Sequence, residues 1–466
     1  MMSWKTIWRS LKSKDMQKRL AIVVGIIVVY RFLAHIVVPL AEPTQLHEAI
    51  EAVLGQTDLG GFLNLLSGGA LSSFSIVLVG LSPFITASII TQLLTKAIPS
   101  LEEMHKDGES GRKKIQQWTR RLTIPLAIIQ SIAFIFILRQ TVLAGSTSTL
   151  GDPTAMEWVV SVMAMTAGSI LLMWLGELIT EQGIGNGISL VIFTGIVSQL
   201  PQMLGTIISS LGDTSQGGLN VFNWFTIPVN PTAFWIILVI AIASLIVLYF
   251  LVKVNEAQRV ITINYAKRVH GNSSYGDIKS ILPIKLIAAG VIPVIFAVAF
   301  LSLPQFVGQV MKASDSVDMQ SIGNTLVTWF QAPNPGAFTG SSVEAFIYPV
   351  LYFILVIAFT YFYTGIVFNA NEIAESLQKQ GGFIEGVRPG LQTEKYLSRT
   401  VNRLILFGSL VLGVIAILPF VAEYILYHIA GVTGTQLSIG GTGLLIVVSV
   451  GLETLRQINS RALMVT

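Results

Sequence analysis

The sequence offers few residues that could catalyse a reaction. It contains no cysteine, which excludes disulfides, thiolate catalysis and Cys-ligated metal sites. No glycine-rich loop followed by Lys and Ser or Thr is present to hold a nucleotide phosphate. We therefore predict that the chain is not an enzyme and uses no metal or cofactor. The histidines are scattered without the spacing of metal ligands: His35, His47, His105, His270 and His428.

Polar residues are found instead on a long apolar segment, Phe74–Leu94. At about 1.5 Å per residue, a helix of this length crosses the roughly 30 Å of hydrocarbon in a bilayer. One interpretation is a helix kinked at Pro83 whose hydroxyl groups bond to its own carbonyl oxygens. The other is a helix with one face turned toward something polar. The polar residues are Ser82, Thr86, Ser88, Thr91 and Gln92.

A shorter apolar piece, Gly61–Leu71, precedes this segment and contains Gly68-Gly69 where a helix would have to continue. A short piece separated by glycines from a full-length span is typical of a discontinuous or re-entrant segment. Such backbone is tolerated at membrane depth only when it is buried in protein or lines a water-filled cavity.

The composition predicts an all-α integral membrane protein. Hydrophobic residues make up 52% of the 466 residues and charged residues 12%, against roughly 25% charged residues in soluble domains. The first apolar run lacks a small-residue cleavage site, so we predict a retained span. Ten spans are expected, at residues 20–40, 74–94, 122–138, 158–174, 184–204, 231–252, 284–303, 343–368, 404–420 and 444–455.

Charge placement predicts the orientation of these spans. With the N-terminus in the cytoplasm, every Lys and Arg falls on the cytoplasmic side except Arg31, Arg139 and Lys312. A charge within a span, such as Arg31, is either functional or extends toward the interface, and the sequence leaves both open.

Between spans two and three, residues 96–121 are expected to form a charged loop, and strand-like residues 260–265 lie in the loop after span six.

Ten spans divide into two sets of five, an arrangement found in proteins built from pseudo-symmetric halves. We predict two five-helix halves. The expected regions are a basic arm (1–19), an N-terminal half (20–204), an external hinge loop (205–230), a C-terminal half (231–455) with cytoplasmic loops 253–283 and 368–403, and a cytoplasmic tail (456–466).

Several long segments resemble the SecY family, the channels of the general secretory pathway. They are Ser67–Thr95, Glu102–Thr123, Trp174–Phe193, Asn264–Arg268, Ala288–Ala297, Tyr361–Leu404 and Gly440–Thr454. The resemblance covers about residues 15–460 and implies a protein-conducting channel in the plasma membrane, with the two halves around a central pore and a short plug helix before the second span. Such a channel passes unfolded preproteins across the membrane and releases membrane spans sideways through a lateral gate.

The same resemblance implies a ring of aliphatic side chains that closes the pore, although such residues are also ordinary core residues. The ring would be Leu81, Ile85, Ile188, Ile192, Ile295 and Ile446. The broken piece would be the plug, or else an external hairpin without a gating role. The plug residues would be Gly61, Phe62, Leu63, Asn64, Leu65, Leu66, Ser67, Gly68, Gly69 and Ala70.

The lateral gate implied by the resemblance lies between spans two and three and spans seven and eight. Thr86, Ser88 and Gln92 are candidates for the polar contacts that hold it shut, or for a merely structural hydroxyl face. Ile287 stands in the predicted seventh span where the family usually has Asn, which weakens a polar gate. Val260 stands where the family usually has a second Arg after Gln258-Arg259.

Exposed cations on the cytoplasmic loops are typical of solvated faces, and they also suit acidic partners. The resemblance implies that Arg259, Lys267, Arg268 and Arg388 dock the ribosome and the SecA motor ATPase. Further expected partners are SecE-like and SecG-like membrane subunits, signal-sequence-bearing preproteins and the lipid bilayer.

Two other functions compete with a channel. A secondary transporter of a small solute shares a broken helix and repeated halves, but it predicts Asp or Glu near the middle of the membrane. Glu177 and Glu423 lie only near the ends of spans, which argues against it. An intramembrane protease would require paired Asp, a Ser/His pair or a metal-binding His motif, and the spans carry none of these in sequence.

Overall fold

The computed structural model describes most of the chain. The described residues are 13–38, 74–138, 154–212, 219–221, 225–227, 231–265, 269–270, 273–274, 279–287, 290–312, 314, 316–331, 333, 343–430 and 437–465. The predicted plug, residues 61–71, and the docking candidates Lys267 and Arg268 lie outside them.

The described residues are mostly helical, as the composition predicts. The long helices are α2 (Lys14–Leu33), α5 (Ser82–Ala97), α7 (Glu109–Leu138), α8 (Ala155–Gln182), α9 (Gly187–Gly212), α10 (Pro231–Glu256), α11 (Ile292–Lys312), α13 (Ile347–Val367), α15 (Leu391–Ala430) and α16 (Leu437–Val465). Shorter ones are α6 (Pro99–Lys106), α12 (Val317–Phe330), the 3₁₀ helix η4 (Val343–Phe346) and α14 (Ala370–Lys379).

Within the described residues, six helices are long and apolar enough to cross a membrane, or seven if α5 and α6 count as one bent span. An all-α membrane architecture is therefore confirmed. The number of ten spans stays a prediction, and so do the boundaries of the two halves.

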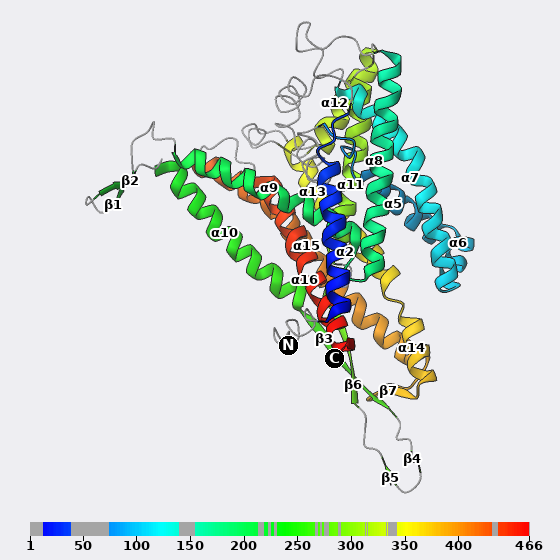
Figure 1. The fold of residues 1–466 in the computed structure, drawn as a ribbon. Coiled ribbons are helices and arrows are strands. Elements are labelled where there is room, and N and C mark those ends of the chain that lie inside the picture. Colours follow the sequence, from blue (N-terminus) through cyan, green and yellow to red (C-terminus); the bar gives the residue numbers. More distant parts are fainter. Residues whose placement is uncertain are drawn as a thin grey trace.

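Most helices pack around one large core, and the short helix α14 lies at one end of the bundle (Figure 1). The start of α2, the end of α16 and the small sheet lie together at this end, while α12 lies at the opposite end. Helix α10 diverges from the bundle (Figure 1). Only 6% of its most apolar stretch is buried. This arrangement agrees with the common side predicted for the two termini and the basic loops.

The second predicted span differs from its expected form. Residues 74–81 form turns, and α5 begins only at Ser82, with Pro83 in its first turn. A proline in the first helical turn costs no hydrogen bond, so the predicted kink at Pro83 is wrong. The expected loop 96–121 is also mostly helical, because α6 follows α5 at a bend of 106° and α7 begins at Glu109.

The predicted seventh span begins too early. Residues 284–285 end a strand, and α11 begins only at Ile292, after a turn in which Gly290 has a positive φ of 62°. Ile287 therefore lies in the turn before α11 and not on the helix itself. The sequence prediction also missed α12, which packs antiparallel against α11.

A small sheet covers the cytoplasmic end under the predicted orientation. β3 (Gln258–Tyr265) lies between β6 (Lys279–Lys285) and β7 (Gly382–Ile384), and both pairings are antiparallel. The strand expected at 260–265 is thus confirmed and extended. Two hairpins complete the described strands: β1 (Leu219–Val221) with β2 (Phe225–Ile227), and β4 (Val269–His270) with β5 (Ser273–Ser274).

Candidate functional site

The six residues of the predicted ring come from four helices and meet in one hydrophobic cluster. Leu81 precedes α5 and Ile85 lies one turn into it, while Ile188 and Ile192 lie on the first turns of α9. Ile295 lies in the first turn of α11 and Ile446 lies on α16. All belong to the same connected core of buried apolar side chains or pack against it.

Ile188 is less buried than the other five members of the predicted ring. Leu81 is 0% exposed and Ile192 is 1% exposed, so neither contacts water. Ile188 is only partly buried, and its Cγ1 atom lies against α8 at Gly176. The cluster also contains many ordinary core residues, so a closed ring of these six side chains stays a prediction.

The turns at residues 74–81 are held in place from two sides. The amide of Val38 donates to the carbonyl of Phe74 (3.0 Å), and the amide of Ile76 donates to the carbonyl of Ile36 (2.9 Å). From α8, the buried hydroxyl of Ser169 donates to the carbonyl of Gly80 at 2.8 Å. These bonds satisfy backbone groups that a helix would have satisfied itself, and they fix the position of Leu81 at the start of α5.

The neighbours expected at a lateral gate do lie next to each other. Helices α5 and α7 both pack against α11, and α11 packs against α13. Thr86 is 3% exposed and lies on the buried face of α5. These contacts agree with a boundary between the two pairs of helices, although the gate itself stays a prediction.

The polar candidates on α5 are mostly bonded within the helix. The Nε2 atom of Gln92 donates to the hydroxyl of Ser88 at 3.2 Å, one turn earlier. Thr91 donates to the carbonyl of Ala87 at 2.7 Å, as the simpler of the two interpretations expected. The Oε1 atom of Gln92, however, is buried and has no hydrogen-bond partner among the described residues, which is a destabilising arrangement.

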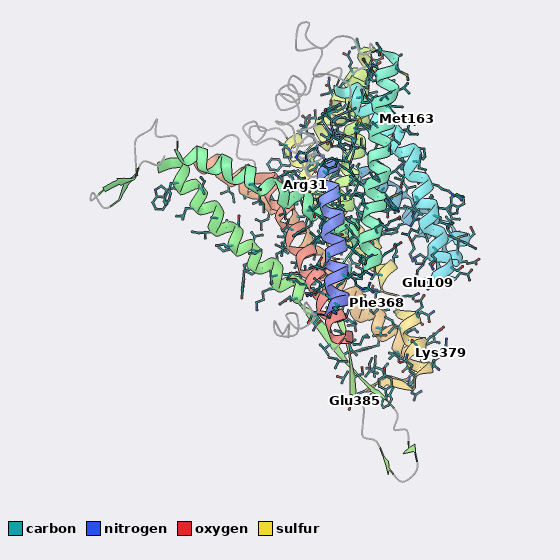
Figure 2. All side chains as sticks on the ribbon, viewed as in Figure 1. Arg31, Glu109, Met163, Phe368, Lys379 and Glu385 are labelled. Carbon is teal, nitrogen blue, oxygen red and sulfur yellow. The ribbon has the colours of Figure 1, made fainter. Side chains whose placement is uncertain are left out.

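Two residues singled out in the sequence lie near this core. Ile287 is 7% exposed and belongs to the same cluster as the predicted ring, although it precedes α11. Arg31 lies in the last turn of α2 and is partly buried (Figure 2). The backbone carbonyl of Arg31 lies 2.8 Å from the Nδ1 atom of His35.

The sequence prediction missed a polar contact between α7 and α8. The Nε atom of Arg120 donates to Oε1 of Glu177 at 2.6 Å, and Nε2 of Gln116 donates to the same oxygen at 3.3 Å. The side chain of Glu177 is 11% exposed and that of Arg120 is 44% exposed, so the carboxylate is shielded from water while the guanidinium group is partly solvated. The spacing of Gln116 and Arg120, four residues apart on one helix face, is the sequence signal that could have revealed it.

A second missed cluster connects the small sheet to α16. Lys285 at the end of β6 lies near Glu453 and Arg456, and Nη2 of Arg456 donates to the carbonyl of Asn255 at 2.8 Å. Partial desolvation, followed by the charge of Arg456, lowers the pKa of Lys285 below its ordinary 10.5, while Glu453 opposes this shift. Glu453 lies seven residues after Ile446, hence on the same face of α16.

Two docking candidates are exposed at the end that carries the sheet. Arg259 lies on β3, and Arg388 lies between Gly386 and Gly390, which both have positive φ angles. Figure 2 places the nearby Lys379 and Glu385 at the same end. Among the described residues, no group of three His, Asp or Glu side chains is placed to hold a metal ion.

Comparison with known proteins agrees with this architecture. A sequence model of the SecY family matches residues 75–455. The protein translocase subunit SecY of Streptomyces coelicolor is 38% identical over 458 residues, covering 97% of this chain and 96% of that protein.

Two solved structures share the fold. A structure described as a protein conducting channel has a TM-score of 0.57 at 20% identity, covering 94% of this chain and 92% of its own. Sec61 in the canine ribosome-channel complex from the endoplasmic reticulum has a TM-score of 0.55 at 19% identity, with the same coverage. The family match and the identity to the bacterial relative establish that this chain is a multi-pass membrane protein of the SecY family.

Proposed function

We propose that this chain is a protein-conducting channel that passes unfolded preproteins across the membrane. The observation that carries the proposal is the convergence of six aliphatic side chains, from α5, α9, α11 and α16, in one core of a SecY-family fold. The alternative of a small-solute transporter lacks such support. The chain is proposed to act without catalysis of its own, so a motor or the ribosome supplies the energy.

The chemistry of these side chains suits a seal around a moving polypeptide. Aliphatic groups make no directional bonds, so they can adapt to any passing sequence, and a narrow apolar constriction excludes ions by dewetting. The segment 61–71 is proposed as a plug on the outer side of this constriction. Thr86, Ser88, Gln92 and Ile287 are proposed to influence the lateral gate, Ile287 from the turn before α11.

The orientation follows from the positive-inside rule. We propose that both termini lie in the cytoplasm of a plasma membrane and that residues 20–204 and 231–455 form the two halves, joined by the external loop 205–230. The small sheet and the loop bearing Arg388 then project into the cytoplasm together, since Figure 1 places them at one end.

This projecting surface is proposed as the docking site for the ribosome and the SecA motor ATPase. Its support is the exposure of Arg259 and Arg388, together with the likeness to a channel described in a ribosome complex. Lys267 and Arg268 are proposed members of the same surface. SecE-like and SecG-like subunits are proposed as membrane partners, and signal-sequence-bearing preproteins as substrates.

A disulfide crosslink tests the proposal. The chain has no cysteine, so Ile295→Cys in proteoliposomes can report contact with a stalled precursor that carries one cysteine in its middle. A matched control is Ile246→Cys on α10, which is 53% exposed and away from the core. We expect a crosslink at Ile295 and none at Ile246.

Other outcomes separate the parts of the proposal. If the precursor is translocated but Ile295→Cys, Ile192→Cys and Ile188→Cys all fail to crosslink, the ring assignment is wrong. If no precursor engages a folded complex, the channel function gives way to the solute transporter.

A further inference from the structure

The helix that the sequence prediction missed, α12, has two chemically different sides. One side carries apolar residues at helical spacing, of which Met319, Ile322 and Trp329 are 46%, 50% and 43% exposed. Leu326 continues the same stripe and is partly buried. The other side carries Ser321, Asn324, Thr325 and Thr328, all exposed. At 3.6 residues per turn, these two stripes lie on opposite flanks of the face packed on α11.

The depth of α12 follows from its contact with α11. A Cβ atom built on Gly308 of α11 would lie 3.0 Å from the carbonyl oxygen of Gly323 and 2.9 Å from the Cβ atom of Leu326. The two backbones therefore approach as closely as glycines allow. Gly308 lies four residues, or about 6 Å, before the end of α11. Because the helices are antiparallel, the second half of α12 lies deeper still.

This depth falls within the hydrocarbon if α11 crosses the bilayer. α11 has 21 residues and is apolar enough to span, which gives it a length of about 31 Å, close to the hydrocarbon thickness. Its own side chains Phe300 and Val307 are 38% and 51% exposed. Ile322 and Trp329 add to this exposed apolar surface on the neighbouring helix.

The hydroxyl groups of α12 are compatible with a position at the edge of the hydrocarbon. Ser321 donates to the carbonyl of Asp318 at 2.8 Å, Thr325 to that of Ser321 at 3.0 Å, and Thr328 to that of Asn324 at 2.8 Å. Each hydroxyl group donates its hydrogen bond within the helix, so it does not need water as an acceptor. The amide of Asn324 on the same flank still favours a polar neighbour.

We propose that α12 is a half-inserted helix of the outer leaflet. Its stripe of Met319, Ile322, Leu326 and Trp329 contacts lipid acyl chains, and its opposite flank faces the aqueous outer side of the bundle. The inference requires that α11 spans the membrane and rests on the orientation proposed above, which puts the end of α11 on the outer side; it is independent of what passes through the chain. α12 thereby forms a wall between lipid and water beside α11.

Neighbouring single cysteines test this placement in proteoliposomes of the full complex. Ile322→Cys is matched with Ser321→Cys, and Trp329→Cys with Thr328→Cys, because the members of each pair share a depth and differ in flank. Each cysteine carries an NBD fluorophore, which is quenched either by nitroxide-labelled lipids or by aqueous iodide added outside. All four positions are exposed, so the substitutions leave the packed core intact.

We expect lipid-borne nitroxide to cause the larger loss of fluorescence at 322 and 329, and iodide at 321 and 328. Equal quenching of all four by iodide would place α12 outside the bilayer and overturn the proposal. Equal quenching of all four by nitroxide would refute the aqueous flank. Protection of 322 and 329 from both quenchers would show that a protein partner covers the stripe, which also overturns it.

Discussion

Gly168 provides a sharp test of how the turns before α5 are held. A Cβ atom built on this residue of α8 would lie 2.1 Å from the carbonyl oxygen of Ile76 and 2.6 Å from its carbonyl carbon. Contacts under 3.0 Å are essentially never observed, so the oxygen distance must grow by about 1 Å. Both obstructing atoms are backbone, and the neighbouring hydroxyl of Ser169 ties this segment to α8.

We expect Gly168→Ala to destabilise the protein by about 1–3 kcal/mol, the usual cost of forcing an extra group into a packed site. Because the displaced segment leads into Leu81, the substitution should also disturb the closed core. The assays are thermal unfolding in detergent and ion leakage from sealed proteoliposomes, and we expect lower stability together with faster leakage.

The matched control is Gly25→Ala in α2, where no atom of the part of the chain that the structure describes lies within 4 Å of the added Cβ atom. This change should be neutral or stabilising by up to about 1 kcal/mol, since alanine is the better helix former. If the two variants behave alike in both assays, the close approach of α8 to Ile76 does not exist as described. Lower stability without leakage would refute only the link from this segment to the closed core.

Two further substitutions test the contacts that the sequence prediction missed. Glu177→Gln should lower stability by up to about 1 kcal/mol in thermal unfolding, because it removes the negative charge paired with the partly exposed Arg120. Glu109→Gln, in a pair with Lys113 that is largely exposed on both sides, should cause no measurable change. Equal effects of the two substitutions would contradict the argument. The lowered pKa of Lys285 means that the folded state releases this proton more readily than the unfolded state, so stability should rise as pH increases from neutral through the lowered pKa toward 10.5. Lys285→Met should flatten this part of the pH profile of the unfolding temperature, and an unchanged profile would rule out Lys285 as its source.

The all-α membrane class could be predicted from the sequence because it depends on properties of whole segments. Hydrophobic length identified α8 and α13, and charge placement assigned one side to the basic loops. The strand at 260–265 was also visible, since Val260–Tyr265 is rich in β-branched residues. These signals accumulate over many residues and therefore tolerate local exceptions.

Helix boundaries could not be predicted equally well, because hydrophobicity does not distinguish helix from other buried backbone. Residues 74–81, 284–287 and 290–291 are as apolar as the helices that follow them, yet they form turns and the end of a strand. The amphipathic α12 was missed for a related reason, since its 14 residues are too short for a full span. The spacing of Gln116 and Arg120 indicates a polar face on α7, but their partner Glu177 depends on how α7 and α8 meet, which no local pattern states.

The turns before α5 show why irregular backbone can persist in such a core. A helix satisfies its own amides and carbonyls, whereas turns in an apolar environment need partners from elsewhere. Here Ile36 and Val38, in the segment that follows α2, supply backbone partners, and Ser169 supplies a hydroxyl from α8. The buried hydroxyl of Ser169 is therefore explained by the carbonyl of Gly80 that it satisfies. Buried hydroxyl groups in this core thus serve in two ways: some, such as Thr91, bond within their own helix, and Ser169 allows a neighbouring segment to leave the helical form.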